Sequence, residues 1–308
     1  MTSVFTDAPE EPEEVRSFVV GQAVIAARPL PAALHLVATP IGNLGDVTLR
    51  ALETLAGADV LACEDTRVTR TLLNRYGIRR KTLSYHEHNA HEVGPKLIAE
   101  IQAGRSVALA SDAGTPLVSD PGFRLVEAAV AAGVPVVPIP GASAPLAALI
   151  ASGLPVAEFF FAGFLPPKEV ARRSRLDALK AVPGTLIFFE SPQRLGASLA
   201  SMAAVLGETR KAAVARELTK TFEEVLRATL GELAERYADL TPKGEIVVCV
   251  GPAEPDAPPE AEEVDALLQQ LAEEMPASKA AAEAARRTGL PKSELFRRLV
   301  ALKEDGGG

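Results

Sequence analysis

The residues suited to chemistry lie in short loops that follow apolar runs of this 308-residue chain. Residues 111–122 read SDAGTPLVSDPG, and they come after an apolar run and before a helical stretch that starts near Phe123. Such a loop exposes main-chain N–H and C=O groups at the carboxyl edge of a sheet, where open α/β folds bind ligands. Its glycines let a ligand approach the main chain closely. Taken alone, the segment is also compatible with an ordinary pair of tight turns, which is the simpler interpretation.

Two more loops of this kind accompany it. Residues 37–46 read VATPIGNLGD, with Asp46 placed to cap the next helix, and residues 138–144 read PIPGASA. Three loops that follow three strands of one domain converge on one edge of the sheet, where main-chain groups would hold a nucleotide-like ligand. The first run is not followed by GxGxxG, and the chain contains no GxxxxGK[ST] segment, so NAD and nucleoside triphosphates are disfavoured.

Charged side chains follow other apolar runs. Residues 63–67 (CEDTR), 190–194 (ESPQR) and 215–220 (ARELTK) place acids and bases at strand ends that face the same crevice. Helix capping is the simpler role for Asp65. Residues 86–91 (HEHNAH) hold three of the four histidines; zinc is an open alternative there, but no second ligand cluster accompanies them, and we predict no metal site.

Positioning these loops requires an α/β architecture. Short apolar runs typical of buried strands alternate with segments of helical periodicity. The predicted strands are residues 34–39, 60–63, 107–111, 134–140, 158–163, 185–189, 212–215 and 245–250. The predicted helices include residues 47–55, 66–75, 92–102, 123–132 and 192–206.

Changes in composition and periodicity along the chain predict five parts. Their bounds are a mobile acidic arm (1–33), a first α/β domain (34–145), a second α/β domain (146–251), a proline-rich linker (252–261) and a module of three short helices (262–304). The expected helices of the module are about 263–274, 278–287 and 292–302. Its basic residues suit either an RNA contact or a solvated face, and both interpretations remain open: Arg286, Arg287, Arg297 and Arg298.

Charge and composition are compatible with an RNA partner. The net charge is −8, but residues 1–20 and 251–278 together carry −12, which leaves +4 for the rest of the chain. The two cysteines, Cys63 and Cys249, lie in apolar runs, which favours a reducing compartment over a disulfide framework. We find neither a signal-peptide pattern nor an apolar stretch long enough for a membrane span, so a cytoplasmic location is expected.

The ordered set of motifs resembles a known family. VATPIGNL (37–44), EDTR (64–67), HEHN (86–89), SDAGTPLVSDPG (111–122), PGASA (140–144), FESP (189–192) and RELTK (216–220) are similar, in order and register, to the bacterial ribosomal RNA methyltransferases of the tetrapyrrole methylase superfamily. The resemblance implies two α/β domains of the tetrapyrrole methylase type with a cleft between them, and a small C-terminal helical module. It also implies S-adenosylmethionine in the cleft, a homodimer, and 2'-O-methylation of a cytidine in the decoding centre of 16S ribosomal RNA, within the 30S subunit or a late precursor.

The resemblance also suggests residues that line the cofactor site. They are Pro40, Thr115, Val118, Ser143, Ala144, Phe189, Leu218 and Gly244. The porphyrin-modifying branch of the superfamily usually has Gly-Asp-Pro where this chain has Gly114-Thr115-Pro116, which disfavours a porphyrin substrate.

Methyl transfer from a sulfonium mainly requires in-line alignment of oxygen, carbon and sulfur. A ribose hydroxyl is a poor nucleophile, so a base, or a cation near the developing alkoxide, should help. The candidates for this role are Asp65, Glu190, Glu217 and Lys220. The candidates for RNA contacts are Arg67, Arg194 and Arg216 for phosphates, and His86 and Asn89 for ribose or base. Two other functions remain open: a porphyrin methyltransferase, and a ribosome-associated binding protein without catalysis.

Overall fold

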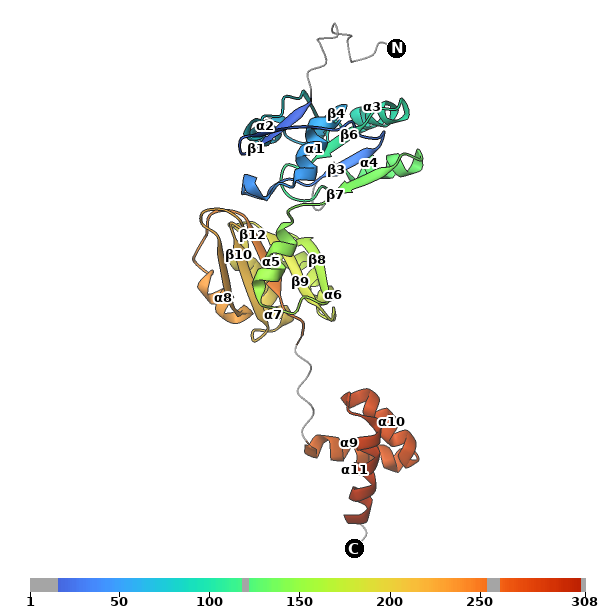
Figure 1. The fold of residues 1–308 in the computed structure, drawn as a ribbon. Helices are drawn as coiled ribbons and strands as arrows, with labels where there is room; N and C mark the ends of the chain where they lie inside the picture. Colours follow the sequence, from blue (N-terminus) through green and yellow to red (C-terminus); the bar gives the residue numbers. More distant parts are fainter. Residues whose placement is uncertain (1–15, 118–121, 254–260, 306–308) are drawn as a thin grey trace. The chain divides into compact units, whose positions relative to one another are not determined.

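The computed structural model describes residues 16–117, 122–253 and 261–305 (Figure 1). The chain divides into two compact units, Met1–Pro252 and Ala253–Gly308. Over the described residues, the first unit contains two five-stranded sheets and one two-stranded sheet, and the second unit contains three helices.

The first sheet is parallel throughout. Its strand order is β5 (Thr82–Ser84), β4 (Val60–Cys63), β6 (Val107–Ala110), β3 (Leu34–Val37) and β7 (Val136–Ile139). The helices that pack on it are α1 (Leu49–Gly57), α2 (Thr66–Arg75), α3 (Ala90–Gln102) and α4 (Phe123–Ala131), and a short 3-10 helix spans Leu44–Asp46. One hydrophobic core joins α1 and α2 to one face, and another joins α3 and α4 to the opposite face. With both faces covered, β4 and β6 are buried at every residue, which explains their continuous apolar runs.

The second sheet is mixed. Its order is β11 (Glu224–Thr229), β10 (Lys211–Arg216), β12 (Ile246–Val250), β9 (Thr185–Glu190) and β8 (Phe159–Phe164). Only β8 and β9 run parallel; the other pairs are antiparallel. Its helices are α5 (Ala144–Ser152), α6 (Glu169–Leu179), α7 (Leu195–Leu206) and α8 (Leu230–Arg236).

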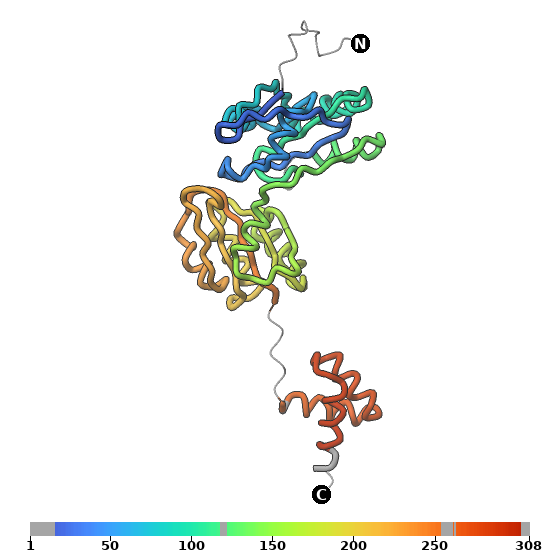
Figure 2. The backbone as a smooth tube through the Cα atoms, viewed as in Figure 1, coloured from blue at the N-terminus to red at the C-terminus, as the bar shows by residue number. Residues whose placement is uncertain are grey.

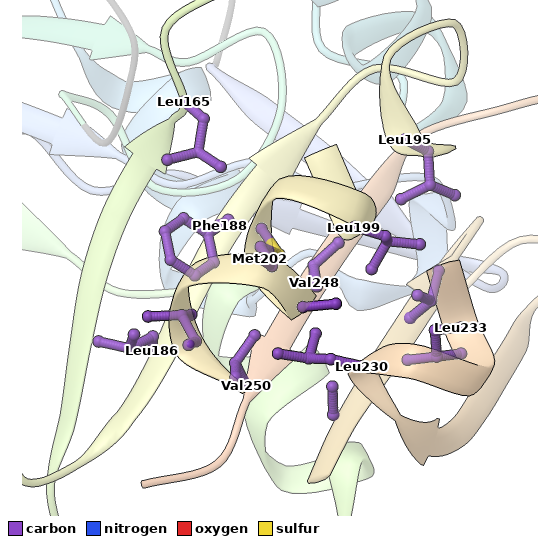
Figure 3. Packing of buried hydrophobic residues seen from close by; sticks show 14 of the residues in the cluster. Leu165, Leu186, Phe188, Leu195, Leu199, Met202, Leu230, Leu233, Val248 and Val250 are labelled. Atoms are coloured by element: carbon purple, nitrogen blue, oxygen red, sulfur yellow. The ribbon is translucent and has the colours of Figure 1, made fainter. Parts of the chain in front are cut away.

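Successive side chains of β9 and β12 point to opposite faces of the second sheet and so belong to two different cores. Leu186 and Phe188 of β9 and Val248 of β12 point into the core under α6, α7 and α8 (Figure 3). Their neighbours Ile187 and Val247 point to the other face, where α5 packs. The period of two is the one expected for strands with different layers on each side.

The chain passes from the first sheet to the second between β7 and α5 (Figure 2). We expected the boundary between residues 145 and 146, a position that lies inside α5. Ala148 and Leu149 of α5 pack against the second sheet, so the whole helix belongs to the second domain and the boundary lies before Ala144.

The prediction of a mobile arm over residues 1–33 is wrong for residues 16–33, the part that the structure describes. Residues 16–33 contain a hairpin of β1 (Ser17–Val20) and β2 (Ala23–Ala26) that packs on the first domain. Phe18 is 3% exposed and lies in the core beside α1, and the main chain of Val19 donates to the carbonyl of Tyr76. The short apolar patch around Phe18 therefore packs on the first domain, a contact that the local composition did not reveal. Residues 1–15 lie outside the described range.

The C-terminal unit consists of α9 (Ala261–Glu274), α10 (Ala277–Thr288) and α11 (Lys292–Asp305), which confirms the expected helical module. Its own core includes Leu268, Ala281 and Leu295, all fully buried. Three of its four candidate RNA-binding arginines pair within the unit: Arg286 and Arg287 with Glu283, and Arg298 with Asp265. Of the expected linker, residues 254–260 lie outside the described part of the chain.

None of the described helices is both long and apolar enough to cross a bilayer.

Candidate active site

A cavity of about 410 Å³ lies where the two α/β domains of the first unit meet. Its volume is in the range of small-molecule sites, and its lining is mainly apolar. The first domain contributes Ile41, Ala113, Gly114 and Thr115, and the residues around the start of α5 contribute Ser143, Ala144 and Pro145. The second domain contributes Phe164, Phe189, Glu190, Ser191, Pro192, Leu218, Gly244, Glu245, Ile246 and Val247.

The three loops predicted to converge do lie together. Thr39 and Gly114 exchange two main-chain hydrogen bonds, of 2.9 and 3.0 Å, which join the loops after β3 and β6. The Thr115 hydroxyl donates to the carbonyl of Ala142 (3.2 Å), which joins the second loop to the one after β7. Gly114 has a φ of +78°, a conformation that glycine adopts without strain.

Six of the eight expected cofactor positions line this cavity: Thr115, Ser143, Ala144, Phe189, Leu218 and Gly244. Pro40 is not in the lining, but its neighbour Ile41 is. Val118 lies outside the described residues.

The second-domain wall includes a strained turn that we did not predict. Leu218 lines the cavity between Glu217 and Thr219, whose φ angles are +52° and +66°. For a β-branched threonine this left-handed backbone is a genuine outlier, and such strain concentrates at functional sites. Gly244 lies behind the turn with a φ of +98°, and a Cβ atom there would overlap the carboxyl group of Glu217.

Lys220 is held between two carboxylates beside the cavity. Its Nζ lies 2.7 Å from Glu217 Oε1 and 2.9 Å from Glu245 Oε2. Burial alone would lower the pKa of Lys220, but the hydrogen bonds to Glu217 and Glu245 outweigh it and raise the pKa. The hydrogen bond from Lys220 in turn lowers the pKa of Glu217. Lys220 is therefore a permanently charged, fixed cation, and neither it nor Glu217 is well placed to take up a proton.

Glu190 lines the cavity but is engaged inside the second domain. Its side chain is fully buried; Ser198 Oγ donates to Oε2 (2.5 Å) and the Ser191 main chain donates to Oε1 (2.8 Å). Arg194 lies 3.5 Å from Oε1 and donates to the carbonyl of Leu165 (2.5 Å). These contacts fix the start of α7, and they leave Arg194 directed into the protein.

Asp65 and Arg67 lie at the carboxyl edge of the first sheet, outside the cavity lining. Asp65 caps α2 by accepting from the Arg67 main chain (2.8 Å) and also pairs with the Arg67 guanidinium (2.6 Å). The hydrogen bond from the Arg67 side chain lowers the pKa of Asp65 to about 2. The simpler capping role of Asp65 is thus present, and the side chain of Arg67 remains 88% exposed.

The remaining RNA candidates lie on separate elements. Asn89 accepts from the main chain of His86 (2.8 Å) and donates to the carbonyl of Ser84 (2.9 Å), so it shapes the loop before α3. Arg216 pairs with Glu224 across β10 and β11. Among the described residues no group of three or more histidine, cysteine or acidic side chains is arranged to hold a metal ion.

Sequence reasoning missed several residues of the site. Gly244 and Glu245 directly precede β12 and line the cavity, and only Gly244 was expected. Phe164 lines the cavity and, with Phe161, contacts the ring of Phe189 at centroid distances of 5.5 and 5.0 Å. The sequence signal for Phe161 and Phe164 was the phenylalanine-rich segment 159–164, which we interpreted only as a strand.

The sequence and the fold match a class of methylases. Residues 33–234 match the family model described as Tetrapyrrole (Corrin/Porphyrin) Methylases, and residues 258–303 match that of the RsmI C-terminal HTH domain. Two solved structures share the fold at 17% identity and 71% coverage of this chain: diphthine synthase (TM-score 0.55, 89% of that chain) and a cobalt precorrin-4 methyltransferase (TM-score 0.54, 95% of that chain).

Curated relatives narrow the class. A protein of Mesorhizobium japonicum named ribosomal RNA small subunit methyltransferase I is 67% identical over 290 residues, which cover 94% of this chain and 98% of the relative. A protein of Xylella fastidiosa with the same name is 49% identical over 271 residues, covering 86% and 98%. The chain belongs to the tetrapyrrole methylase family, in the group of the ribosomal RNA small subunit methyltransferase I proteins.

Proposed function

We propose that this protein transfers the methyl group of S-adenosylmethionine to the ribose 2'-hydroxyl of a cytidine in the decoding centre of 16S ribosomal RNA. The observation that carries the proposal is the cavity formed by the three converging loops and the strained turn around Leu218, in a chain of this family. Its lining of main-chain groups and apolar side chains suits a donor with an adenine ring and a short aliphatic chain.

The chain's own residues then act mainly by alignment. The main-chain loops after β3, β6 and β7 and the Phe189 ring would hold the donor, so that its methyl group meets the nucleophile in line. Orientation of this kind contributes on the order of several kcal/mol to lowering the barrier. We place Lys220 on the acceptor side: its ammonium group, fixed by Glu217 and Glu245, would lie near the negative charge that develops on the ribose oxygen.

The carboxyl edge of the first sheet is the side where we place the RNA. Arg67 is exposed there, and the loop of His86 and Asn89 follows the neighbouring strand β5. An exposed guanidinium suits a backbone phosphate, and imidazole and amide groups suit ribose and base edges. Arg194 and Arg216 are both paired within the second domain, which makes them weaker candidates.

We further propose that the protein acts as a homodimer. The supporting observation is β8, an edge strand of the second sheet that carries the partly exposed Phe159 and Phe160. Light scattering of the purified full chain would detect the dimer as a mass near twice 32.3 kDa.

The test of the proposed function is mapping of 2'-O-methyl sites in ribosomal RNA from cells with and without the protein. We expect one cytidine of the decoding centre to lose its methyl group when the protein is absent. Purified protein should label 30S subunits, or their precursor, from methyl-labelled donor, with naked RNA and a porphyrin as comparison acceptors. Label on the porphyrin alone, or RNA binding without donor binding, would overturn the proposal.

A further inference from the structure

Asp112 lies in the loop after β6, at the carboxyl edge of the first sheet, next to the cavity lining but not part of it. It follows β6, and the next three residues, Ala113, Gly114 and Thr115, line the cavity. Its Oδ1 accepts a hydrogen bond of 2.9 Å from the main chain of Asp65, the residue that caps α2 beside Arg67. Asp112 therefore connects the place proposed for the donor to the place proposed for the RNA.

The other acidic candidates of the site are already engaged. Asp65 pairs with Arg67 and has a pKa of about 2. Glu190 accepts hydrogen bonds on both oxygens, and the carboxylate of Glu217 accepts from Lys220 and from the main chain of Glu245. A carboxylate held by cations or by several donors is a weak proton acceptor.

Asp112 differs from them in its surroundings. Within residues 16–117, 122–253 and 261–305, no lysine, arginine or histidine side chain forms an ion pair with it. Burial raises the pKa of Asp112; the hydrogen bond from the Asp65 main chain opposes this, and the nearby Asp65 charge raises the pKa further. The net shift of the pKa is upward, so Asp112 is more basic than an ordinary aspartate. Such a shift brings a general base closer to the working pH.

We propose that Asp112 is the general base that accepts the proton of the ribose 2'-hydroxyl during methyl transfer, an assignment that rests on the proposed function. As the proton moves to Oδ2 of Asp112, the 2'-oxygen forms a bond to the methyl carbon of the sulfonium. The bond between this carbon and sulfur breaks, and its electron pair stays on sulfur, which becomes a neutral thioether. The proton then leaves Asp112 for solvent.

The decisive variant is Asp112→Asn. Its amide oxygen can still accept from the Asp65 main chain, so the fold and the loop should persist. We expect kcat to fall by about 100-fold or more, the range for loss of a general base, while the Kd for the donor stays within about threefold. The matched control is Asp177→Asn, the same chemical change at an exposed position on α6, which should leave both quantities unchanged.

The pH profile separates a base from a merely structural residue. In the wild type, kcat should fall as the pH drops through the raised pKa of Asp112, because the protonated carboxyl cannot accept a second proton. In Asp112→Asn the residual rate should lose this acid limb. If the variant keeps kcat within about twofold of an active wild type, or if it loses donor binding as strongly as turnover, the assignment is overturned while the proposed function stands. If the wild type itself fails to methylate 30S subunits and RNA, the proposed function falls and the assignment falls with it.

Discussion

The two walls of the cavity are built in different ways. The first-domain wall consists of short loops tied together by main-chain hydrogen bonds, such as the pair between Thr39 and Gly114. The second-domain wall is an ion-paired turn with left-handed backbone at Glu217 and Thr219, and the large ring of Phe189. The difference teaches that the first wall presents backbone groups, so its side chains tolerate change, while the second depends on the backbone shape of the turn and on the ring of Phe189.

The largest expected effect is on the second wall, at Gly244. Gly244→Ala places a Cβ atom on the Glu217 carboxyl group and strains a φ of +98°. Both effects displace the turn that carries Leu218, so we expect donor affinity to fall by about 100-fold, near 2.7 kcal/mol, in calorimetric titrations.

The matched control is Gly104→Ala, which has a similar φ of +89° but open space around its Cβ position. It should lower the melting temperature slightly and leave the donor Kd unchanged. Equal donor affinity in the Gly244 variant and the wild type would show that the second wall does not depend on this turn.

The second largest effect is expected for Lys220→Ala. Removing the cation leaves Glu217 and Glu245 without their shared partner beside the reacting centre, so kcat for methyl transfer should fall by roughly 10- to 100-fold. The donor Kd, measured by calorimetry, should change by less than about threefold, because Lys220 is not part of the cavity lining. Equal losses of binding and turnover would place Lys220 on the donor and contradict its assignment to the acceptor side.

The smallest effect is expected on the first wall. Thr115→Ala removes one hydroxyl that donates to the Ala142 carbonyl at 3.2 Å and leaves the main chain in place. Donor Kd and kcat should each change by less than about threefold, in line with the loss of a single ordinary hydrogen bond. A 100-fold loss would mean that the first wall, too, acts through its side chains, and the contrast between the walls would disappear.

Most strands and helices could be predicted because their signals are local. The run 107–110 is apolar at every position because β6 is covered on both faces, and α2 matches its expected bounds because Asp65 caps it at Thr66. Besides the hairpin strands β1 and β2, the prediction missed β5 and β11, which are edge strands of the two large sheets with half-exposed residues and no continuous apolar run.

The site was predictable in part for a related reason. Loops after parallel strands share one edge by geometry, so Thr115 and Ser143 could be placed together from the order of the strands. The partners of charged side chains could not be inferred in this way. The pairing of Lys220 with Glu245 joins residues 25 positions apart through the antiparallel pairing of β10 with β12.

By itself, the sequence determined the α/β class, the three convergent loops and the family, because periodicity and motif spacing are properties of neighbouring residues. Only the tertiary structure decided that residues 16–33 contain a packed hairpin, that Glu190 is fully engaged, and that Asp112 faces the start of α2 with no described cation paired to it. These outcomes depend on which distant groups share a buried space, and burial and charge pairing there are set by the packing of the two sheets and their helices.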